Sequence, residues 1–276
     1  NLGSGNFSGM VAPRIAMAWG DGTAPTSAGA ARYVLEQRYG LPVSIIRTAR
    51  LRSADLSRFD VLILPESGGF ADSGEMGDSG AQALTRFVSG GGVLIGLGDA
   101  TRWMASSSVD LLPVQRERAA DAIPPDGAEG PVIPGRIIAD EGELLAAEQP
   151  RNAMPESSPG ALLRITANAD AWMSAGYDDG AYALVTGSDI YSTVPLDELT
   201  TALRFAGPSD VVGGGYLWEE NRAQIAFKPF VVSRRSGSGY VIAFTQDPTT
   251  RAYQEGLDLT LLNAVLLGPA HASPLR

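Results

Sequence analysis

The beginning of the chain alternates between short apolar runs and segments in which apolar residues recur at helical spacing. Apolar runs that predict strands cover residues 14–19, 43–46, 61–64 and 93–95, and helical spacing covers residues 27–39, 51–58, 78–89 and 99–104. Strands and helices that alternate in this way form parallel sheets joined by right-handed crossovers. The pattern therefore predicts an α/β fold with a doubly wound, mostly parallel sheet flanked by helices. Ligands of such sheets bind at the carboxyl ends of the strands.

The chain changes character after the fourth predicted strand. Residues 113–160 are rich in Pro, Gly, Glu and Ala and show little periodicity, which predicts a long insertion in the domain. Later runs predict an additional, C-terminal β-rich part, with strands over 162–165, 181–185, 203–205, 225–227, 230–233 and 240–244. A helix over 257–267 should end at Gly268-Pro269. We expect one domain over 13–269, with a disordered or artificial leader over 1–12 and a tail over 270–276.

The amino-acid composition excludes several kinds of chemistry. The chain contains no cysteine, which excludes thiol nucleophiles, disulfides and thiolate metal sites. Its single histidine, His271, lies in the expected tail and cannot build a zinc site alone. The net charge of -10 disfavours nucleic-acid binding, and no run of about 20 apolar residues predicts a membrane span. We therefore expect no metal, no cofactor and no nucleic-acid partner.

Three motifs lie at the ends of predicted strands. They are Leu62-Ile-Leu-Pro65-Glu66-Ser67-Gly68-Gly69, Gly92-Val-Leu-Ile-Gly96-Leu-Gly98-Asp99, and Gly239-Tyr-Val-Ile-Ala-Phe244 with Asp247-Pro and Arg251. Together they resemble the class I glutamine amidotransferase-like superfamily, which has a flavodoxin-like sheet. The resemblance implies an oxyanion hole in the first turn and a nucleophile elbow in the second motif, with the nucleophile position at Gly96. It also implies a triad histidine after the third motif, where this sequence has none.

The C-terminal half adds a narrower resemblance. It contains, in order, Asp179-Gly-Ala-Tyr-Ala-Leu-Val185, Gly213-Gly-Gly-Tyr-Leu-Trp218-Glu-Glu220, the strand 239–244, Asp247-Pro-Thr-Thr-Arg251 and Leu261-Leu-Asn263-Ala-Val-Leu266. This order is similar to the amidotransferase-like domain that follows the catalytic domain of large secreted bacterial M14 zinc carboxypeptidases. The resemblance implies an accessory domain without a zinc site, an upstream zinc carboxypeptidase domain as partner in the same polypeptide, and a secreted or periplasmic location.

Hydroxyl and carboxylate side chains are the remaining candidates for catalysis. Ser67 lies beside the expected oxyanion turn, but no histidine is available to activate it. Glu66, Asp99 and Asp247 fall at strand ends, as does Asp21, and we expect them to gather around one crevice. Paired carboxylates can hydrolyse a glycosidic bond or hold a hard cation. Alternatively, Asp99 caps the following helix and Asp247 pairs with Arg251.

Further residues are candidates for binding in the crevice. They are Trp19, Gly68, Gly69, Gly98, Trp218 and Arg251. Tryptophan at the crevice rim could stack on a ligand, although packing against the core is the more common use of this residue. Three functions stay open: a non-catalytic accessory domain that binds a partner or a substrate, a hydrolase that uses Glu66, Asp99 and Asp247, and a structural or oligomerisation module in which the 113–160 segment covers the crevice.

Overall fold

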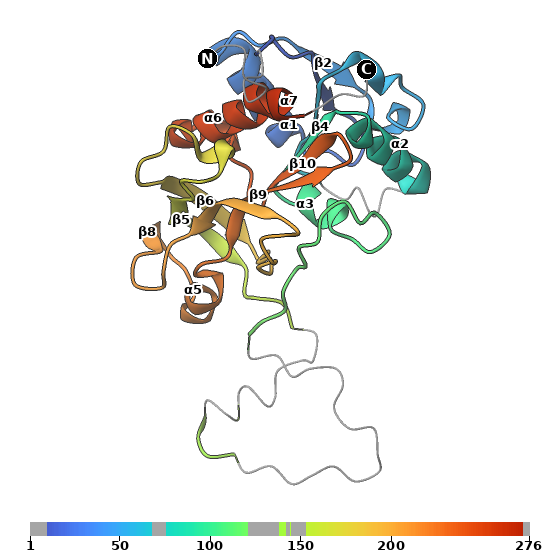
Figure 1. Ribbon diagram of the computed structural model, residues 1–276. Helices are drawn as coiled ribbons and strands as arrows, with labels where there is room; N and C mark the ends of the chain where they lie inside the picture. The colour runs from blue at the N-terminus through green and yellow to red at the C-terminus, as the bar shows by residue number, and fades with distance from the viewer. Residues whose placement is uncertain (1–9, 68–75, 121–137, 142–143, 145–152, 273–276) are drawn as a thin grey trace, which may run out of the picture.

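The first part of the chain forms alternating strands and helices, as predicted. The computed structural model describes residues 10–67, 76–120, 138–141, 144 and 153–272 (Figure 1). Its first elements are β1 (Ile15–Ala18), α1 (Pro25–Tyr33), η1 (Val34–Arg38), β2 (Val43–Ile46), η2 (Thr48–Arg50), η3 (Leu56–Arg58), β3 (Val61–Leu64), α2 (Gly77–Ser89), β4 (Val93–Leu97) and α3 (Ala100–Met104). The continuous apolar runs become strands because both faces of the sheet are covered.

The C-terminal part adds mostly strands. Its elements are β5 (Ser158–Ala167), η4 (Trp172–Ser174), β6 (Ala181–Gly187), β7 (Thr200–Phe205), β8 (Val212–Gly215), α5 (Glu219–Ile225), β9 (Pro229–Ser236), β10 (Gly239–Phe244), η5 (Thr250–Ala252), α6 (Glu255–Leu262), η6 (Asn263–Leu267) and α7 (Gly268–His271). Strands β9 and β10 form a hairpin, because they pair antiparallel across a turn at residues 237–238.

One sheet joins both parts. The described residues form a 10-stranded sheet in the order β2-β1-β3-β4-β10-β9-β7-β5-β6, and β8 pairs with β5. Strands β2, β1, β3, β4 and β10 run parallel, whereas the pairs from β10–β9 onward are antiparallel. The predicted fold class is confirmed: a mostly parallel α/β sheet is extended by a C-terminal β-rich part.

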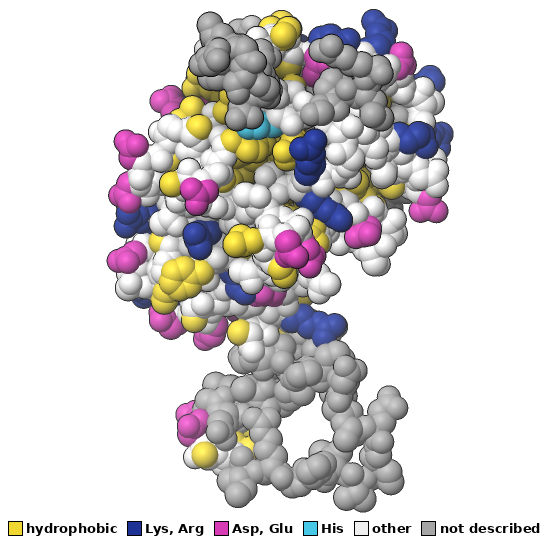
Figure 2. All heavy atoms as spheres, in the orientation of Figure 1, with side chains coloured by type: hydrophobic (Ala, Val, Ile, Leu, Met, Phe, Trp, Pro, Cys, Tyr) yellow, Lys and Arg dark blue, Asp and Glu magenta, His cyan; other side chains and the backbone are white. Residues whose placement is uncertain are grey.

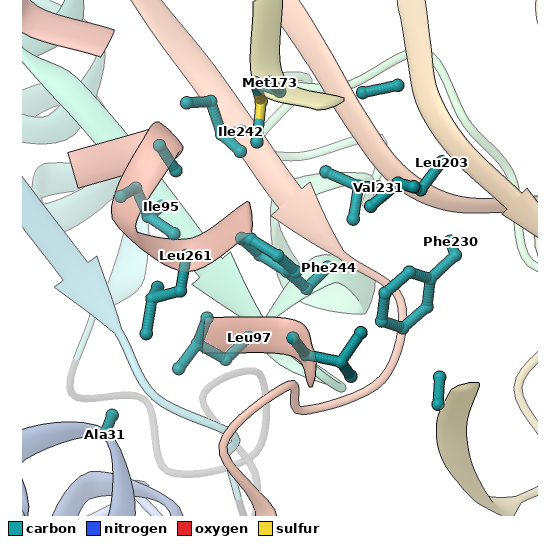
Figure 3. Packing of buried hydrophobic residues seen from close by; sticks show 14 of the residues in the cluster. Ala31, Ile95, Leu97, Met173, Leu203, Phe230, Val231, Ile242, Phe244 and Leu261 are labelled. Carbon is teal, nitrogen blue, oxygen red and sulfur yellow. The ribbon is translucent and has the colours of Figure 1, made fainter. Parts of the chain in front are cut away.

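Helices cover both faces of the parallel strands. In β1, Ile15 and Met17 belong to the core cluster shared with α1 and α6, while Ala16 and Ala18 belong to the cluster shared with α2 and α3. The same alternation continues along β3 and β4, as period-2 side-chain geometry requires. Figure 3 shows the first cluster, in which the Phe230 and Phe244 rings lie close together. The strand ends are therefore held between two packed layers.

Some local predictions were wrong. Residues 225–227 do not form a strand, because α5 ends at Ile225 and Phe227 has a left-handed φ of 64°. The closing helix does not stop at Gly268-Pro269. Proline lacks an amide hydrogen but fits a first helical turn, and here it lies in the first turn of α7. The His271 ring at the end of α7 stacks on Trp172, with centroids 4.7 Å apart, so it is not a disordered tail residue.

Much of the predicted leader, insertion and tail lies outside the described residues. The described start of the insertion, residues 113–120, runs beside the segment after β6: the Glu117 amide donates to the Ile190 carbonyl and the Ser192 amide donates to the Gln115 carbonyl, each at 2.8 Å. No helix among the described residues is long and apolar enough to span a bilayer. Acidic and basic side chains are interspersed on the face shown in Figure 2.

Candidate functional site

Three carboxylates meet at the carboxyl ends of the parallel strands. Glu66 follows β3, Asp99 follows β4 and Asp247 follows β10, and these three strands are consecutive in the sheet. The negative charges of Asp247 and Asp99 both act on the Glu66 carboxyl and raise its pKa. The structure therefore brings together the three acidic residues that the sequence placed at strand ends. Asp21, in contrast, is exposed on the turn after β1.

The turn from β4 into α3 is built around a left-handed glycine. Gly98 has a φ of 56°, and a Cβ atom at this position would lie 2.8 Å from Oε1 of Glu66. The left-handed backbone conformation favours glycine here, and a Cβ atom would also crowd the end of the Glu66 side chain. The Glu66 carboxyl thus occupies the space in front of the strand-to-helix turn.

The predicted nucleophile position at Gly96 needs correction. Gly96 lies inside β4, and a Cβ atom there would lie 2.1 Å from Cε of Met104, in the packing between β4 and α3. A side chain at Gly96 would enter the core rather than the crevice. Nucleophiles of elbow-type enzymes sit on the sharp turn after the strand, with their side chain exposed. In this chain that turn is centred on Gly98, two residues later.

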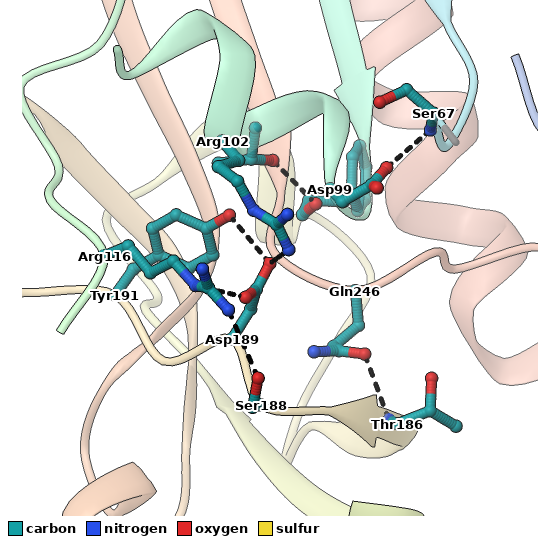
Figure 4. Close-up of polar contacts among 11 residues, drawn as sticks. Ser67, Asp99, Arg102, Arg116, Thr186, Ser188, Asp189, Tyr191 and Gln246 are labelled. Atoms are coloured by element: carbon teal, nitrogen blue, oxygen red, sulfur yellow. Dashed lines mark hydrogen bonds and ion pairs between the residues drawn. The ribbon is translucent and has the colours of Figure 1, made fainter. Parts of the chain in front are cut away.

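Asp99 binds the neighbouring strand-end loop instead of capping its own helix. Its Oδ1 accepts a hydrogen bond from the Ser67 amide at 2.5 Å, and it makes no side-chain capping bond to α3 (Figure 4). Burial raises the pKa of the Asp99 carboxyl, and the Ser67 amide and the Arg102 charge oppose this effect. The predicted N-cap role of Asp99 is therefore wrong, because Ser67 offers its amide across the crevice.

Burial and neighbouring charges strongly perturb the acidity of the Glu66 carboxyl. Burial raises the pKa of its carboxyl to about 7, and the charges of Asp247 and Asp99 add to the effect. Its backbone is fixed independently of its side chain, since the Glu66 amide donates to Oγ of Ser27 at 3.0 Å. A carboxyl with this pKa can exist in both protonation states near neutral pH, as a general acid or base requires.

Asp247 is buried and is bound by its own loop. Its Oδ1 accepts hydrogen bonds from both the amide and the hydroxyl of Thr249, each at 2.7 Å. Arg251, the predicted partner, instead lies exposed in η5 with a φ of 51°. The predicted ion pair between Asp247 and Arg251 is wrong, because Thr249 binds the Asp247 carboxylate and Arg251 lies exposed. Burial raises the pKa of the Asp247 carboxyl despite the Ser27 and Thr249 hydrogen bonds.

A second polar group, which the sequence did not reveal, lies beside the three carboxylates. Figure 4 shows Asp189 between two arginines: its carboxylate lies 2.7 Å from Nη2 of Arg102 and 2.5 Å from Nε of Arg116. Tyr191 is buried beside this group, with its hydroxyl 3.5 Å from Asp189. Asp189 follows β6 in a segment without any recognisable motif. Its contact with α3 is therefore visible only in the folded structure. The two arginines neutralise it within the negative crevice.

The remaining predicted crevice residues lie in different places. Trp19 is partly buried and packs against the core cluster on the α1 face. Trp218 precedes α5, beside β8, and its ring packs edge-on against Tyr216 rather than at the ends of the parallel strands. Gly68 and Gly69, the expected oxyanion turn, lie outside the described residues. Within the residues that the structure describes, no group of three or more His, Cys, Asp or Glu side chains is suited to a metal ion.

Comparisons with known proteins show the fold of the chain. No protein-family model matches it, and no curated protein matches its sequence. A glutamine amidotransferase from Thermotoga maritima has a TM-score of 0.52 at 7% identity, over 94% of this chain and 99% of that one. A protein assigned as a GMP synthase component, from Thermoplasma acidophilum, has a TM-score of 0.53 at 12% identity, over 91% and 92%. A protein assigned as ThuA-like from Parabacteroides merdae has a TM-score of 0.53 at 10% identity, over 95% and 92%. The chain is therefore similar to amidotransferase-like proteins in fold.

Proposed function

We propose that this chain is a non-catalytic, amidotransferase-like accessory domain of a secreted carboxypeptidase-like protein, and that it binds a partner domain or a substrate segment in its strand-end crevice. The observation that carries the proposal is the elbow turn. Its left-handed residue is Gly98, which has no nucleophile, and the Glu66 carboxyl lies where a side chain at this position would begin. Acyl transfer without a nucleophile and an activating base loses most of its rate.

Two further features argue against amidotransferase chemistry. The single histidine, His271, lies in the C-terminal helix α7 and stacks on Trp172 of η4. The three carboxylates, in contrast, lie at the ends of β3, β4 and β10. Ser67 belongs to the first motif, in which the oxyanion turn was expected. Its amide already donates a hydrogen bond to the Asp99 carboxylate. An oxyanion would have to displace this internal anion, so the donor is not available for a tetrahedral intermediate.

An activity assay tests the non-catalytic part of the proposal. We expect the purified chain to hydrolyse neither glutamine nor p-nitrophenyl acetate above the rate in buffer. The matched variants are Ser67→Ala at the strand ends and Ser57→Ala in the exposed part of η3. Turnover that is lost in Ser67→Ala and retained in Ser57→Ala would contradict the proposal, because it would identify a working nucleophile.

The accessory role has a separate test. Its support is the ordered set of C-terminal motifs from Asp179 to Leu266, together with the cluster of carboxylates at the strand ends. The coding sequence upstream of Asn1 should contain a zinc carboxypeptidase domain with a His-x-x-Glu motif, and an upstream domain of another class would refute the assignment. Light scattering of the isolated chain is the second measurement: self-association would favour the oligomerisation module that the sequence also left open.

A hydrolase that uses the crevice carboxylates is the second candidate. The pKa of about 7 at Glu66 favours it, because this carboxyl could donate or accept a proton near neutral pH beside Asp99 or Asp247. Release of p-nitrophenol from aryl glycosides between pH 5 and 8 is the assay. Activity that disappears in Glu66→Gln would support this candidate over the first. A folded protein that is inactive on α- and β-linked hexosides and pentosides would remove it.

A further inference from the structure

A concavity lies at the end of the parallel strands opposite to Glu66, Asp99 and Asp247. It is bordered by the residues that enter these strands: Arg14 precedes β1, Asp60 precedes β3 and Gly92 precedes β4. The loop around η3 and the face of α2 form its sides. Its volume of about 450 Å³ lies in the range of pockets that bind small molecules. The carboxylates of the crevice do not line this pocket.

The acidic groups of this pocket are already satisfied. Asp60 accepts three hydrogen bonds from Arg14, from its amide at 2.8 Å and from its guanidinium at 3.1 and 2.9 Å. Asp55 accepts from both the amide and the hydroxyl of Ser57, at 3.2 and 2.6 Å. Neither carboxylate therefore needs another partner, and the Arg14 charge is neutralised by Asp60.

Two arginines of the same pocket are not neutralised by a described residue. Arg52, after η2, and Arg86, on α2, line the concavity from two sides. Within the described part of the chain, neither guanidinium makes a hydrogen bond or an ion pair. Guanidinium groups bind carboxylate and phosphate oxygens in a paired, charge-assisted geometry.

The pocket also has an apolar wall. Phe59 and Phe87 line it from the loop before β3 and from α2. Gly92 allows Phe87 to take this position, because a Cβ atom at residue 92 would lie 2.4 Å from the Phe87 ring. Phe59, Phe87, Arg52 and Arg86 thus border the same space. Apolar walls with a few polar groups are typical of small-molecule sites.

We propose that this pocket binds a small organic anion, with its carboxylate or phosphate group between Arg52 and Arg86 and its planar apolar part against Phe59 and Phe87. The pocket is large enough for a ligand of one ring and one anionic group. The negative charge of the whole protein opposes the approach of an anion, so recognition depends on the two local guanidinium groups. The site is independent of the strand-end crevice and of the function proposed for it.

Isothermal titration calorimetry on the full chain tests the proposal. The probes are benzoate and phenyl phosphate, which separate the two anionic groups, with inorganic phosphate and benzyl alcohol as probes that lack the ring or the charge. We expect at least one aryl anion to bind at least about tenfold more tightly than both partial probes. Binding of neither aryl anion at about 10 mM, or equal binding of benzyl alcohol, would overturn the proposal.

Substitutions at the two arginines locate the binding. Arg52→Gln and Arg86→Gln should each weaken binding of the aryl anion by about tenfold, the change that one charge-assisted contact produces. The matched control is Arg58→Gln, an exposed arginine of η3 that does not line the pocket, and it should change affinity by less than about twofold at physiological salt. All three side chains are exposed, so circular dichroism should show an unchanged fold. Affinity that is equal in all three variants would place the anion elsewhere and refute the assignment.

Discussion

Replacement of Glu66 by glutamine should change how the stability of the protein depends on pH. In the folded protein, burial and the charges of Asp247 and Asp99 raise the pKa of the Glu66 carboxyl from 4.5 to about 7. The folded state therefore binds this proton at a higher pH than the unfolded state does. By linkage, the free energy of unfolding falls as the pH rises from about 4.5 to about 7, and the full cost of the buried charge is present above that range.

The size of the effect follows from the same pKa values. The difference between 4.5 and about 7 corresponds to about 3 kcal/mol if the carboxyl is fully shielded from water. The Glu66 side chain is only partly buried, so solvent screening should reduce this to about 1–2 kcal/mol. Glu66→Gln removes the charge and nearly preserves the shape. We expect the variant to match the wild-type protein near pH 4.5 and to be more stable by about 1–2 kcal/mol at pH 8.

Urea denaturation at several pH values between 4.5 and 8.5 measures this difference. The matched control is Glu198→Gln, which removes one carboxylate from an exposed turn and should leave the pH dependence parallel to that of the wild type. Asp99 and Asp247 also have raised pKa values, so some slope should remain in Glu66→Gln. Parallel curves for Glu66→Gln and wild type over the whole range would show that the crevice does not destabilise the Glu66 charge, and the reasoning would fail.

Three further substitutions test the packing of the strand-to-helix turn and one buried ion pair. Gly98→Ala should destabilise the protein by about 2–3 kcal/mol in urea denaturation. The control Gly40→Ala, at a left-handed position with open space, should cost only about 1 kcal/mol. Equal losses would mean that the Glu66 carboxylate moves aside without cost. Gly96→Ala should cost about 1–3 kcal/mol because its methyl group meets a buried methionine, and a neutral effect would contradict the assignment of this residue to the core. Arg38→Met should cost about 3 kcal/mol, since it leaves the buried Asp258 carboxylate without the guanidinium 2.6 Å away, and thermal melting that is unchanged would refute this.

The parallel half of the fold could be predicted from the sequence almost residue by residue. The run 61–64 coincides with β3, because strands buried on both faces are continuous apolar runs. The run 43–46 coincides with β2, although this edge strand is exposed at Ser44 and Ile45. The C-terminal half was less predictable. Strand β8 includes Gly213, Gly214 and Gly215, and three glycines give no side-chain pattern from which a strand can be recognised. The helix α5 was missed because its polar residues show no apolar stripe.

The site was predictable in position but not in its contacts. Strand ends in a parallel sheet meet at one edge, so the sequence placed Glu66, Asp99 and Asp247 together correctly. Their partners depend on the loops, and no spacing rule predicts that Asp99 binds the Ser67 amide or that Asp247 binds Thr249. The elbow position was wrong by two residues for a related reason. A sequence with glycine at two nearby positions does not show which of them has a positive φ.

In the accessory-domain proposal, the carboxylate cluster at the strand ends serves a ligand rather than stability. Glu66, Asp99 and Asp247 all have raised pKa values because burial disfavours their charged forms, so the crevice is destabilising near neutral pH. Unfavourable clusters of titratable groups are typical of functional sites. A cationic segment of a partner would reverse the effect, because a positive charge in the crevice lowers the pKa of Glu66. In the accessory-domain proposal, protonation of Glu66 removes part of this attraction, so complex formation with a cationic segment should weaken between pH 7 and pH 5. A complex whose affinity is equal at both values would have to be held by another surface.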